Sequence, residues 1–306
     1  MISIEEGDGV GNGDFLLTAV KLTEPNFLNA VQAMWSPSKD VYLKKDVLQG
    51  YSKQQYADRL NVIMQGSQNN AVEAAYRYAG LPYASEVQSI IVSDAGSEGA
   101  LVKSFKAGDK LLGIEGAGRF ESLEQLLDML VKLDGKKESV FEVERAGELI
   151  RIPVYSGAFS SAMNAEQMLK ALGIGSLTEL RSLEPKDSSK RLTIAAGEIG
   201  GPSAGLVFAL QALDLLTEGD LSGGYRIAAT GTITADGRVG AIGGIKQKII
   251  ISNAEGAQLF LAPAHNYEEA KAKAKAIGSS MKVVSVESLE QAIERINEFK
   301  EAAAQS

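Results

Sequence analysis

The residue of this 306-residue chain best placed for nucleophilic chemistry is a serine at a sharp turn. Ser203 follows Gly200-Gly201-Pro202, which separates a strand predicted over 191–199 from a helix predicted to begin at Ser203-Ala204-Gly205. At such a turn, unpaired backbone N–H groups and the positive end of the helix dipole converge. The position therefore suits attack by the Ser203 hydroxyl on a carbonyl group.

The backbone around Ser203 offers donors for the negative charge that such an attack creates. Gly200 and Gly201 let the main chain approach a substrate carbonyl closely, and with Ala204 they are the predicted oxyanion and substrate-backbone residues. Two simpler interpretations stay open from the turn alone. Ser203 can be an ordinary helix N-cap, the commonest role of a serine at such a place, or the turn can bind an anion.

A pair of lysines at the start of a later helix supplies a second reactive group. The segment 225–251 is predicted to form a strand ending at Thr230-Gly231-Thr232-Ile233-Thr234, a turn at Asp236-Gly237, a strand over 239–242 and a helix that begins at Ile245. The first turn of that helix carries Lys246 and Lys248. Measured from Ile245 at about 100° per residue, Lys248 lies at about −60° and Lys246 at about +100°. Lys248 is therefore predicted to lie nearer the buried face.

A serine hydroxyl needs a base, and neither a carboxylate nor a histidine adjoins the Ser203 motif. A lysine can serve if its amine is neutral, but at a pKa of about 10.4 only ~0.1% of a lysine is neutral near pH 7. Burial of Lys248 against the neighbouring isoleucines would lower that pKa. Thr230 is predicted to hold the amine towards Ser203. The alternative is a solvated lysine with no catalytic role.

Three sequence stretches resemble the signatures of the Lon-type serine-lysine peptidases. They are Gly201-Pro202-Ser203-Ala204-Gly205, Thr230-Gly231-Thr232-Ile233 and Ile242-Gly243-Gly244-Ile245-Lys246-Gln247-Lys248. The resemblance implies that Ser203 is the nucleophile, Lys248 the general base and Thr230 the residue that orients the lysine. Many Lon proteins carry a carboxylate three residues before the serine, where this chain has Gly200. No GxxxxGK[ST] loop occurs, so an ATP-independent serine endopeptidase is expected.

The stretch 85–156 has a composition of its own, with short predicted strands separated by glycine turns. The strands are predicted over 87–92, 110–114, 140–145 and 149–154, with one amphipathic helix over 122–132. This order resembles a PDZ domain of the bacterial protease-associated type. The resemblance implies a peptide groove lined by Ile90, Ile91, Val92 and Leu126, which would recruit or gate protein substrates. The alternative is a small packing module that binds no peptide.

The first quarter of the chain completes the expected architecture. A strand is predicted over Phe15–Leu22, and a helix capped at Ser67 is predicted to stop at Gly80-Leu81-Pro82. These elements resemble the opening of the Lon proteolytic domain. The expected fold class is α+β, a Lon-type proteolytic domain with an inserted PDZ domain. Residues 1–84 and 157–306 would form the proteolytic domain, and 85–156 the insertion. This combination resembles the YlbL-type proteases of Gram-positive bacteria.

Composition and charge exclude several other classes of protein. The net charge is −8 and basic residues occur at most in short clusters, which argues against nucleic-acid binding. The absence of Cys and the single histidine, His265, predict no metal site and no cofactor. No stretch is apolar enough to span a bilayer. The family resemblance implies a missing N-terminal membrane anchor, an extracytoplasmic location and a homo-oligomeric ring. A catalytically silent PDZ-bearing scaffold is the alternative function.

Overall fold

The computed structural model describes residues 2–4, 13–20, 22–36, 39–96, 102, 104–133, 138–155, 163–195 and 200–305. The chain divides into two compact units. Unit 1 comprises Met1–Gln49, Ser67–Ala84 and Leu183–Ser306, and unit 2 comprises Gly50–Gly66 and Ser85–Ser182. Unit 2 thus differs from the predicted range 85–156, because it also includes Gly50–Gly66 and continues to Ser182. The predicted boundary at 156–157 itself lies outside the described residues.

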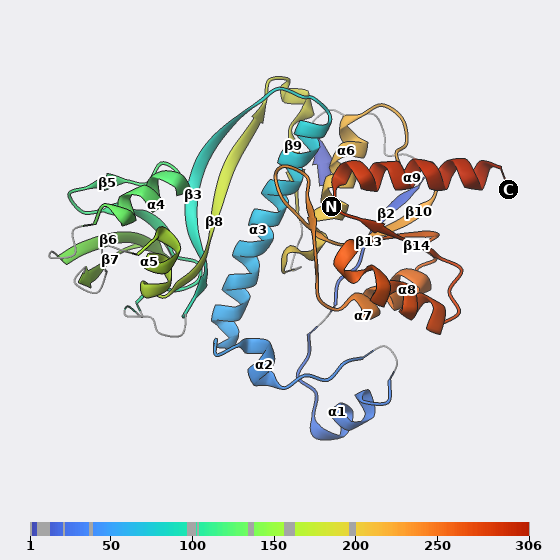
Figure 1. The fold of residues 1–306 in the computed structure, drawn as a ribbon, viewed down its shortest axis with the longest axis horizontal. Helices are drawn as coiled ribbons and strands as arrows, with labels where there is room; N and C mark the ends of the chain where they lie inside the picture. The colour runs from blue at the N-terminus through green and yellow to red at the C-terminus, as the bar shows by residue number, and fades with distance from the viewer. Residues whose placement is uncertain are drawn as a thin grey trace. The chain divides into compact units, whose positions relative to one another are not determined.

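A four-stranded parallel sheet forms the centre of unit 1. Its strands lie in the order β14, β13, β10 and β2 (Figure 1). They span Lys282–Val286, Leu259–Pro263, Arg226–Ala229 and Asp14–Leu17, respectively. The middle strands read as short apolar runs because both faces of the sheet are covered. Ile227, Leu259 and Leu261 are fully buried.

Helices cover both faces of this sheet. α7 (Ile245–Ala254) and α8 (Tyr267–Ala276) pack against Ala228, Phe260 and Ala262 on one face. α6 (Gly205–Leu216) and α9 (Leu289–Ala304) pack on the other (Figure 1). α6 is apolar nearly all round and largely buried, as expected of a helix inside a domain.

Short elements complete unit 1. Two antiparallel pairs are formed by β1 (Ile2–Ile4) with β9 (Leu192–Ile194), and by β11 (Thr232–Ile233) with β12 (Val239–Gly240). The remaining short helices are α1 (Phe27–Ala33), α2 (Lys44–Leu48), and the 3-10 turns η2 (Ser188–Lys190), η3 (Pro202–Ala204) and η4 (Ala264–Asn266). The predicted hairpin and the helix from Ile245 are confirmed. Part of the strand predicted over 191–199 lies outside the described residues.

Unit 2 is built around an antiparallel sheet with the strand order β7, β6, β4, β3 and β8, and β5 pairs with β4. The strands span Glu148–Tyr155, Glu138–Arg145, Lys110–Ile114, Tyr83–Ala95, Ile174–Pro185 and Gly118–Arg119 (β5). α4 (Leu123–Val131) and α5 (Ala165–Ala171) contribute to one core with the sheet. The predicted strand–turn–helix order is present. The strand β8 was not predicted.

A buried ion pair holds the turn that enters β4. Asp109 is fully buried and accepts hydrogen bonds from Arg145 Nε at 2.6 Å and Nη2 at 2.7 Å. It also accepts from the backbone N–H of Lys106 at 2.8 Å. A carboxylate with three donors is well compensated for its burial. Asp109, the residue directly before β4, therefore fixes the start of this strand.

The groove predicted along 87–92 is not open in the structure. β3 lies between β4 and β8, so both of its edges are already paired. Ile90, Ile91, Val92 and Leu126 are each at most 4% exposed, and all but Ile91 belong to the core of unit 2. The prediction assigned apolar residues on a strand and a helix to the lining of a groove. In the structure, β8 pairs with the strand edge that an added peptide would need.

The helix expected to start at Ser67 is also longer than predicted. α3 runs over Lys53–Tyr78, so Ser67 lies inside it and is not a cap. The polar run Ser67-Gln68-Asn69-Asn70 resembles a helix start because such side chains usually cap. Here Ser67 and Asn70 make tertiary hydrogen bonds instead.

Candidate functional site

The chain on either side of Ser203 requires glycine at two positions. Gly201 has a φ of +90°, in the left-handed region that side chains rarely adopt. At Gly205 an added Cβ would lie 2.8 Å from Ile233 Cγ2 and from Ser67 Oγ. The turn η3 therefore runs into α6 in close contact with neighbouring backbone, and Ser203 sits on it, partly exposed.

The Ser203 backbone is fastened to the end of β10. Its carbonyl oxygen accepts hydrogen bonds from Thr230 Oγ1 at 3.0 Å and from the Gly231 N–H at 2.9 Å. The Leu206 N–H in turn donates to Gly231 O at 3.1 Å. Three bonds thus tie the serine turn to the segment that follows β10, which limits movement of the nucleophile.

Two side chains of α3 support the same turn from within unit 1. Ser67 Oγ donates to Pro202 O at 3.1 Å, and Asn70 Nδ2 donates to Ile233 O at 3.1 Å. The sequence did not lead us to predict that Ser67 and Asn70 support this turn. The signal that could have found them is the run of polar residues just before the apolar half of the helix.

Lys248 lies in the first turn of α7 and is 3% exposed. Its amine donates to the Thr18 backbone oxygen at 2.5 Å and to Thr18 Oγ1 at 3.5 Å. Burial lowers the pKa of Lys248 from 10.5 to about 8. Lys246 is exposed and pairs with Glu269 at 3.0 Å. The prediction that Lys248 is the more buried lysine is therefore confirmed.

The loop that leads into the lysine helix is held by Asn266. Its Oδ1 accepts from the Ile242 N–H at 2.9 Å, and its Nδ2 donates to Ile242 O at 3.0 Å. Asn266 is 8% exposed, so the paired bonds are sheltered from water. The first turn of the lysine helix makes a second contact, in which the Gln247 side-chain amide donates a hydrogen bond to Asp40.

The structure brings two of the predicted catalytic residues into contact, Ser203 and Thr230. The third, Lys248, contacts Thr18, which was not predicted as a site residue. Among the described residues, both hydrogen bonds of the Lys248 amine go to Thr18, so none joins it to Ser203 or to Thr230. The hydroxyl predicted to orient the lysine holds the serine backbone instead.

The predicted oxyanion residues share the serine turn. Gly201 and Ala204 are buried and Gly200 is exposed. The predicted groove residues Ile90, Ile91, Val92 and Leu126 all belong to unit 2.

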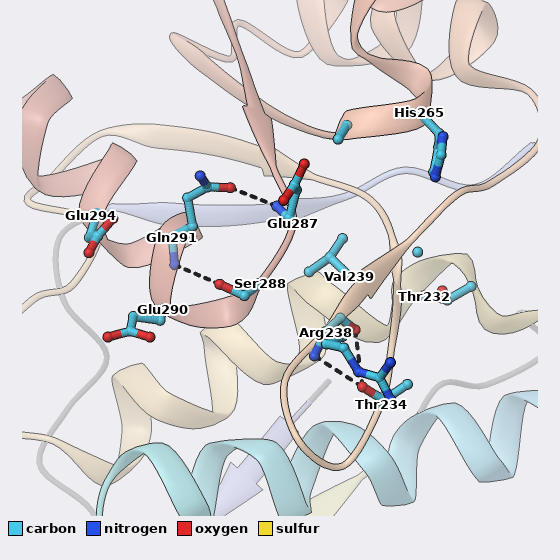
Figure 2. A pocket seen from close by; sticks show the side chains of 12 residues that line it. Thr232, Thr234, Arg238, Val239, His265, Glu287, Ser288, Glu290, Gln291 and Glu294 are labelled. Atoms are coloured by element: carbon cyan, nitrogen blue, oxygen red, sulfur yellow. Dashed lines mark hydrogen bonds between the residues drawn. The ribbon is translucent and has the colours of Figure 1, made fainter.

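A pocket of about 760 Å³ lies beside the hairpin of β11 and β12. Figure 2 shows that the pocket is lined by hairpin residues such as Thr234, Arg238 and Val239 and by residues at the start of α9 such as Gln291. Ser203 and Lys248 are not among its lining residues. His265, exposed on η4, lines this pocket. The pocket lining includes Glu287, Glu290 and Glu294.

The described ranges contain no group of three or more His, Cys, Asp or Glu side chains arranged to hold a metal ion. Within the same ranges, none of the helices has the length and apolar composition that crossing a membrane requires.

Residues 190–298 match the family of the Lon protease (S16) C-terminal proteolytic domain. The Lon protease of Campylobacter concisus is 35% identical over 91 residues, which cover 29% of this chain and 11% of that protein. The Lon protease of Clostridioides difficile is 28% identical over 147 residues, covering 46% and 18%. The peroxisomal Lon protease homolog 2 of Caenorhabditis briggsae is 34% identical over 119 residues, covering 39% and 15%.

The matched family range contains all three residues of the predicted catalytic group, Ser203, Thr230 and Lys248. The matches span less than a fifth of the length of each of these three relatives. The C-terminal part of the chain is thus similar to the Lon protease proteolytic domain, which supports a serine peptidase.

Proposed function

We propose that this chain is an ATP-independent serine endopeptidase in which Ser203 is the nucleophile and Lys248 the general base. The observation that carries the proposal is the burial of Lys248, which brings its pKa to about 8 in the same unit as a serine on a glycine-rich turn. Near pH 8 about half of such an amine is neutral and able to accept a proton. ATP independence is supported by the lack of a GxxxxGK[ST] loop in the chain.

The proposed reaction has two halves. Ser203 Oγ bonds to the carbonyl carbon of the scissile peptide while its proton passes to Lys248 Nζ. When the tetrahedral intermediate collapses, the C–N bond breaks and the Lys248 ammonium gives its proton to the leaving amine. An ester joins Ser203 to the acyl half of the substrate. Water then attacks the ester, with Lys248 accepting the water proton and returning it to Ser203.

The negative oxygen of each tetrahedral intermediate needs donors at the serine turn. Gly201 and Ala204 lie at this turn, directly before α6. The helix dipole and the nearby backbone N–H groups favour negative charge there. We assign the oxyanion role to this stretch of backbone, with Gly200 as the exposed residue that the substrate meets first.

Unit 2 is proposed to be a PDZ-type module that recruits or gates protein substrates. Its strand–helix order supports this assignment, but the added-strand position must differ from the one predicted along 87–92. β7 and β8 are the outer strands of its described sheet. Glu179 on β8 accepts from the Leu123 N–H at the start of α4 at 2.7 Å, so β8 and α4 adjoin. A peptide would therefore add beside β8.

The remaining expectations rest on family resemblance alone. They are a homo-oligomeric ring, membership of the YlbL-type group and an extracytoplasmic location. Light scattering of the purified chain would test the ring, with a monomer at working concentration counting against it.

The deciding experiment is incubation of the chain with casein in the absence of ATP, beside its Ser203→Ala variant. We expect cleavage by the native chain and none by the variant. A fluorophosphonate probe should label the native chain at Ser203. Casein cleavage that persists in Ser203→Ala, or labelling at another serine, would contradict the proposal.

A further inference from the structure

Two threonines occupy matching places at the ends of neighbouring strands. In the parallel pairing of β2 with β10, the last partners are Leu17 and Ala229. The residues that follow them are Thr18 and Thr230, which are 6% and 0% exposed. Because the carboxyl ends of parallel strands meet at one edge of a sheet, these residues leave the sheet at the same edge.

The two threonines make different contacts. Thr230 donates its hydroxyl to the Ser203 carbonyl, whereas Thr18 accepts from the Lys248 amine. A neutral lysine amine has two N–H bonds and one lone pair, and only the lone pair can take the serine proton. Thr18 offers two acceptors to this amine, its carbonyl oxygen at 2.5 Å and its hydroxyl oxygen at 3.5 Å.

We propose that Thr18 is the positioning residue of Lys248, binding the two N–H bonds of the neutral amine so that its lone pair is left for the Ser203 proton. This rests on the proposed function, since it assigns the orientation of that same base. Thr230 then positions the nucleophile, and the work is divided between two adjacent strand ends.

The charged groups near α7 are engaged elsewhere. Lys246 pairs with Glu269 from α8, and Asp40 accepts from Gln247. Burial is the one cause of the shifted pKa of Lys248. The amine thus has neutral oxygens as its acceptors in the described chain. A carboxylate in their place would favour the charged ammonium and abolish the lone pair at neutral pH.

The test compares three changes at one position, Thr18→Val, Thr18→Ser and Thr18→Asp. Valine keeps the branched shape but removes the hydroxyl acceptor, and serine keeps the hydroxyl. Thr217→Val is the matched control, because Thr217 follows the far end of α6 and its hydroxyl bonds to Leu213 O at 2.8 Å. The readout is the rate of Ser203 labelling by a fluorophosphonate between pH 6 and 10.

Thr18→Val is expected to slow labelling about 10-fold or more, because the amine loses its orientation. Thr18→Ser should restore the rate to within a few-fold, and Thr217→Val should label like the native chain. Thr18→Asp should raise the pH midpoint of labelling by at least ~1 unit, with activity recovering towards pH 10. A native rate in Thr18→Val together with an unmoved midpoint in Thr18→Asp would overturn the proposal.

A separate measurement distinguishes this inference from the proposed function. The chain can be produced with ¹³C-labelled lysine at the ε-carbon, and the titration of Lys248 followed by NMR in the native chain and in Thr18→Asp. A raised midpoint in the variant supports the contact with Thr18 even if the native chain fails to label, whereas an unchanged midpoint contradicts it. If Thr18→Asp does not fold by circular dichroism, the rates of Thr18→Val and Thr18→Ser decide.

Discussion

Lys246 and Lys248 lie two residues apart in the same helical turn but in opposite surroundings. Lys248 is buried, and Lys246 is exposed and paired with Glu269. We expect Lys248→Ala to abolish casein cleavage and Lys246→Ala to keep it within a few-fold, because an exposed ion pair contributes little. Both variants should give native circular dichroism. An inactive Lys246→Ala beside an active Lys248→Ala would show that the base is misassigned.

The pH dependence of acylation reports the same amine. Only the neutral form accepts the serine proton, so activity should rise with pH and reach half its maximum near the pKa of Lys248, about 8. The fluorophosphonate labelling rate over pH 6–10 measures this midpoint. A plateau already complete near pH 6 would instead indicate a carboxylate or His265 as the base, while leaving Ser203 as the nucleophile.

Burial of Lys248 should also cost stability in a pH-dependent way. Its pKa of about 8 lies below the ordinary 10.5, so the folded state disfavours the ammonium. This penalty is complete below pH 8, shrinks between pH 8 and 10.5, and vanishes above that range. We expect Lys248→Met to raise the free energy of unfolding at pH 7 by up to about 3 kcal/mol.

Urea denaturation of Lys248→Met at pH 7 and at pH 11 measures that effect, with the exposed Lys246→Met as its control. The gain should appear at pH 7 and disappear at pH 11. An equal gain at both pH values would point to packing of the methionine and not to relief of a buried charge.

At the scale of elements, close packing of α6 against the β11 segment predicts a sharp response to one methyl group. Gly205→Ala would place a Cβ 2.9 Å from the Ile233 backbone nitrogen, which cannot move aside cheaply. We expect a loss of roughly 1–3 kcal/mol in the free energy of unfolding. Gly243→Ala meets no atom within 4 Å and should be neutral or slightly stabilising. Thermal or urea unfolding of both variants checks the difference.

The elements that the sequence predicts well are those with a strong local signal. The strand over 110–114 and the helix bounded by Ser122 were both found, because apolar spacing and a capping residue are local features. The burial of Lys248 also followed from helical spacing. Such signals need no knowledge of the tertiary partner.

The missed features depend on partners distant in the chain. β8 carries Glu179, Arg181 and Glu184, so its sequence does not show the apolar pattern of a buried strand. Its strand conformation is instead stabilised by pairing with β3, which is distant in the chain. Thr18 could not be singled out because its closest contact uses a backbone oxygen, which every residue type carries.

At the scale of the whole molecule, the division into two units predicts which deletion should leave a folded core. Removing about 86–155 would take away β3 but leave β8 without the strand it pairs with. We expect the protein that carries this deletion to aggregate. Removing 85–182 and joining the ends by a short Gly/Ser linker should leave unit 1 folded and labelled by a fluorophosphonate. Solubility, circular dichroism and Ser203 labelling compare the two deletion variants. A folded variant after removal of 86–155 and an aggregated one after removal of 85–182 would contradict the observed boundaries of the two units.

β3, the strand that leads into unit 2, begins beside the end of β8, the strand that leads out of it. The Lys186 N–H donates to Pro82 O at 2.9 Å, so the chain departs and returns at neighbouring points. The entropic cost of bringing such points together grows only slowly with the length of chain between them. In evolutionary terms, this is a place where a whole domain can be gained, exchanged or lost in one genetic event without rerouting the peptidase core. Relatives that share unit 1 should therefore differ most in what they carry between these two strands.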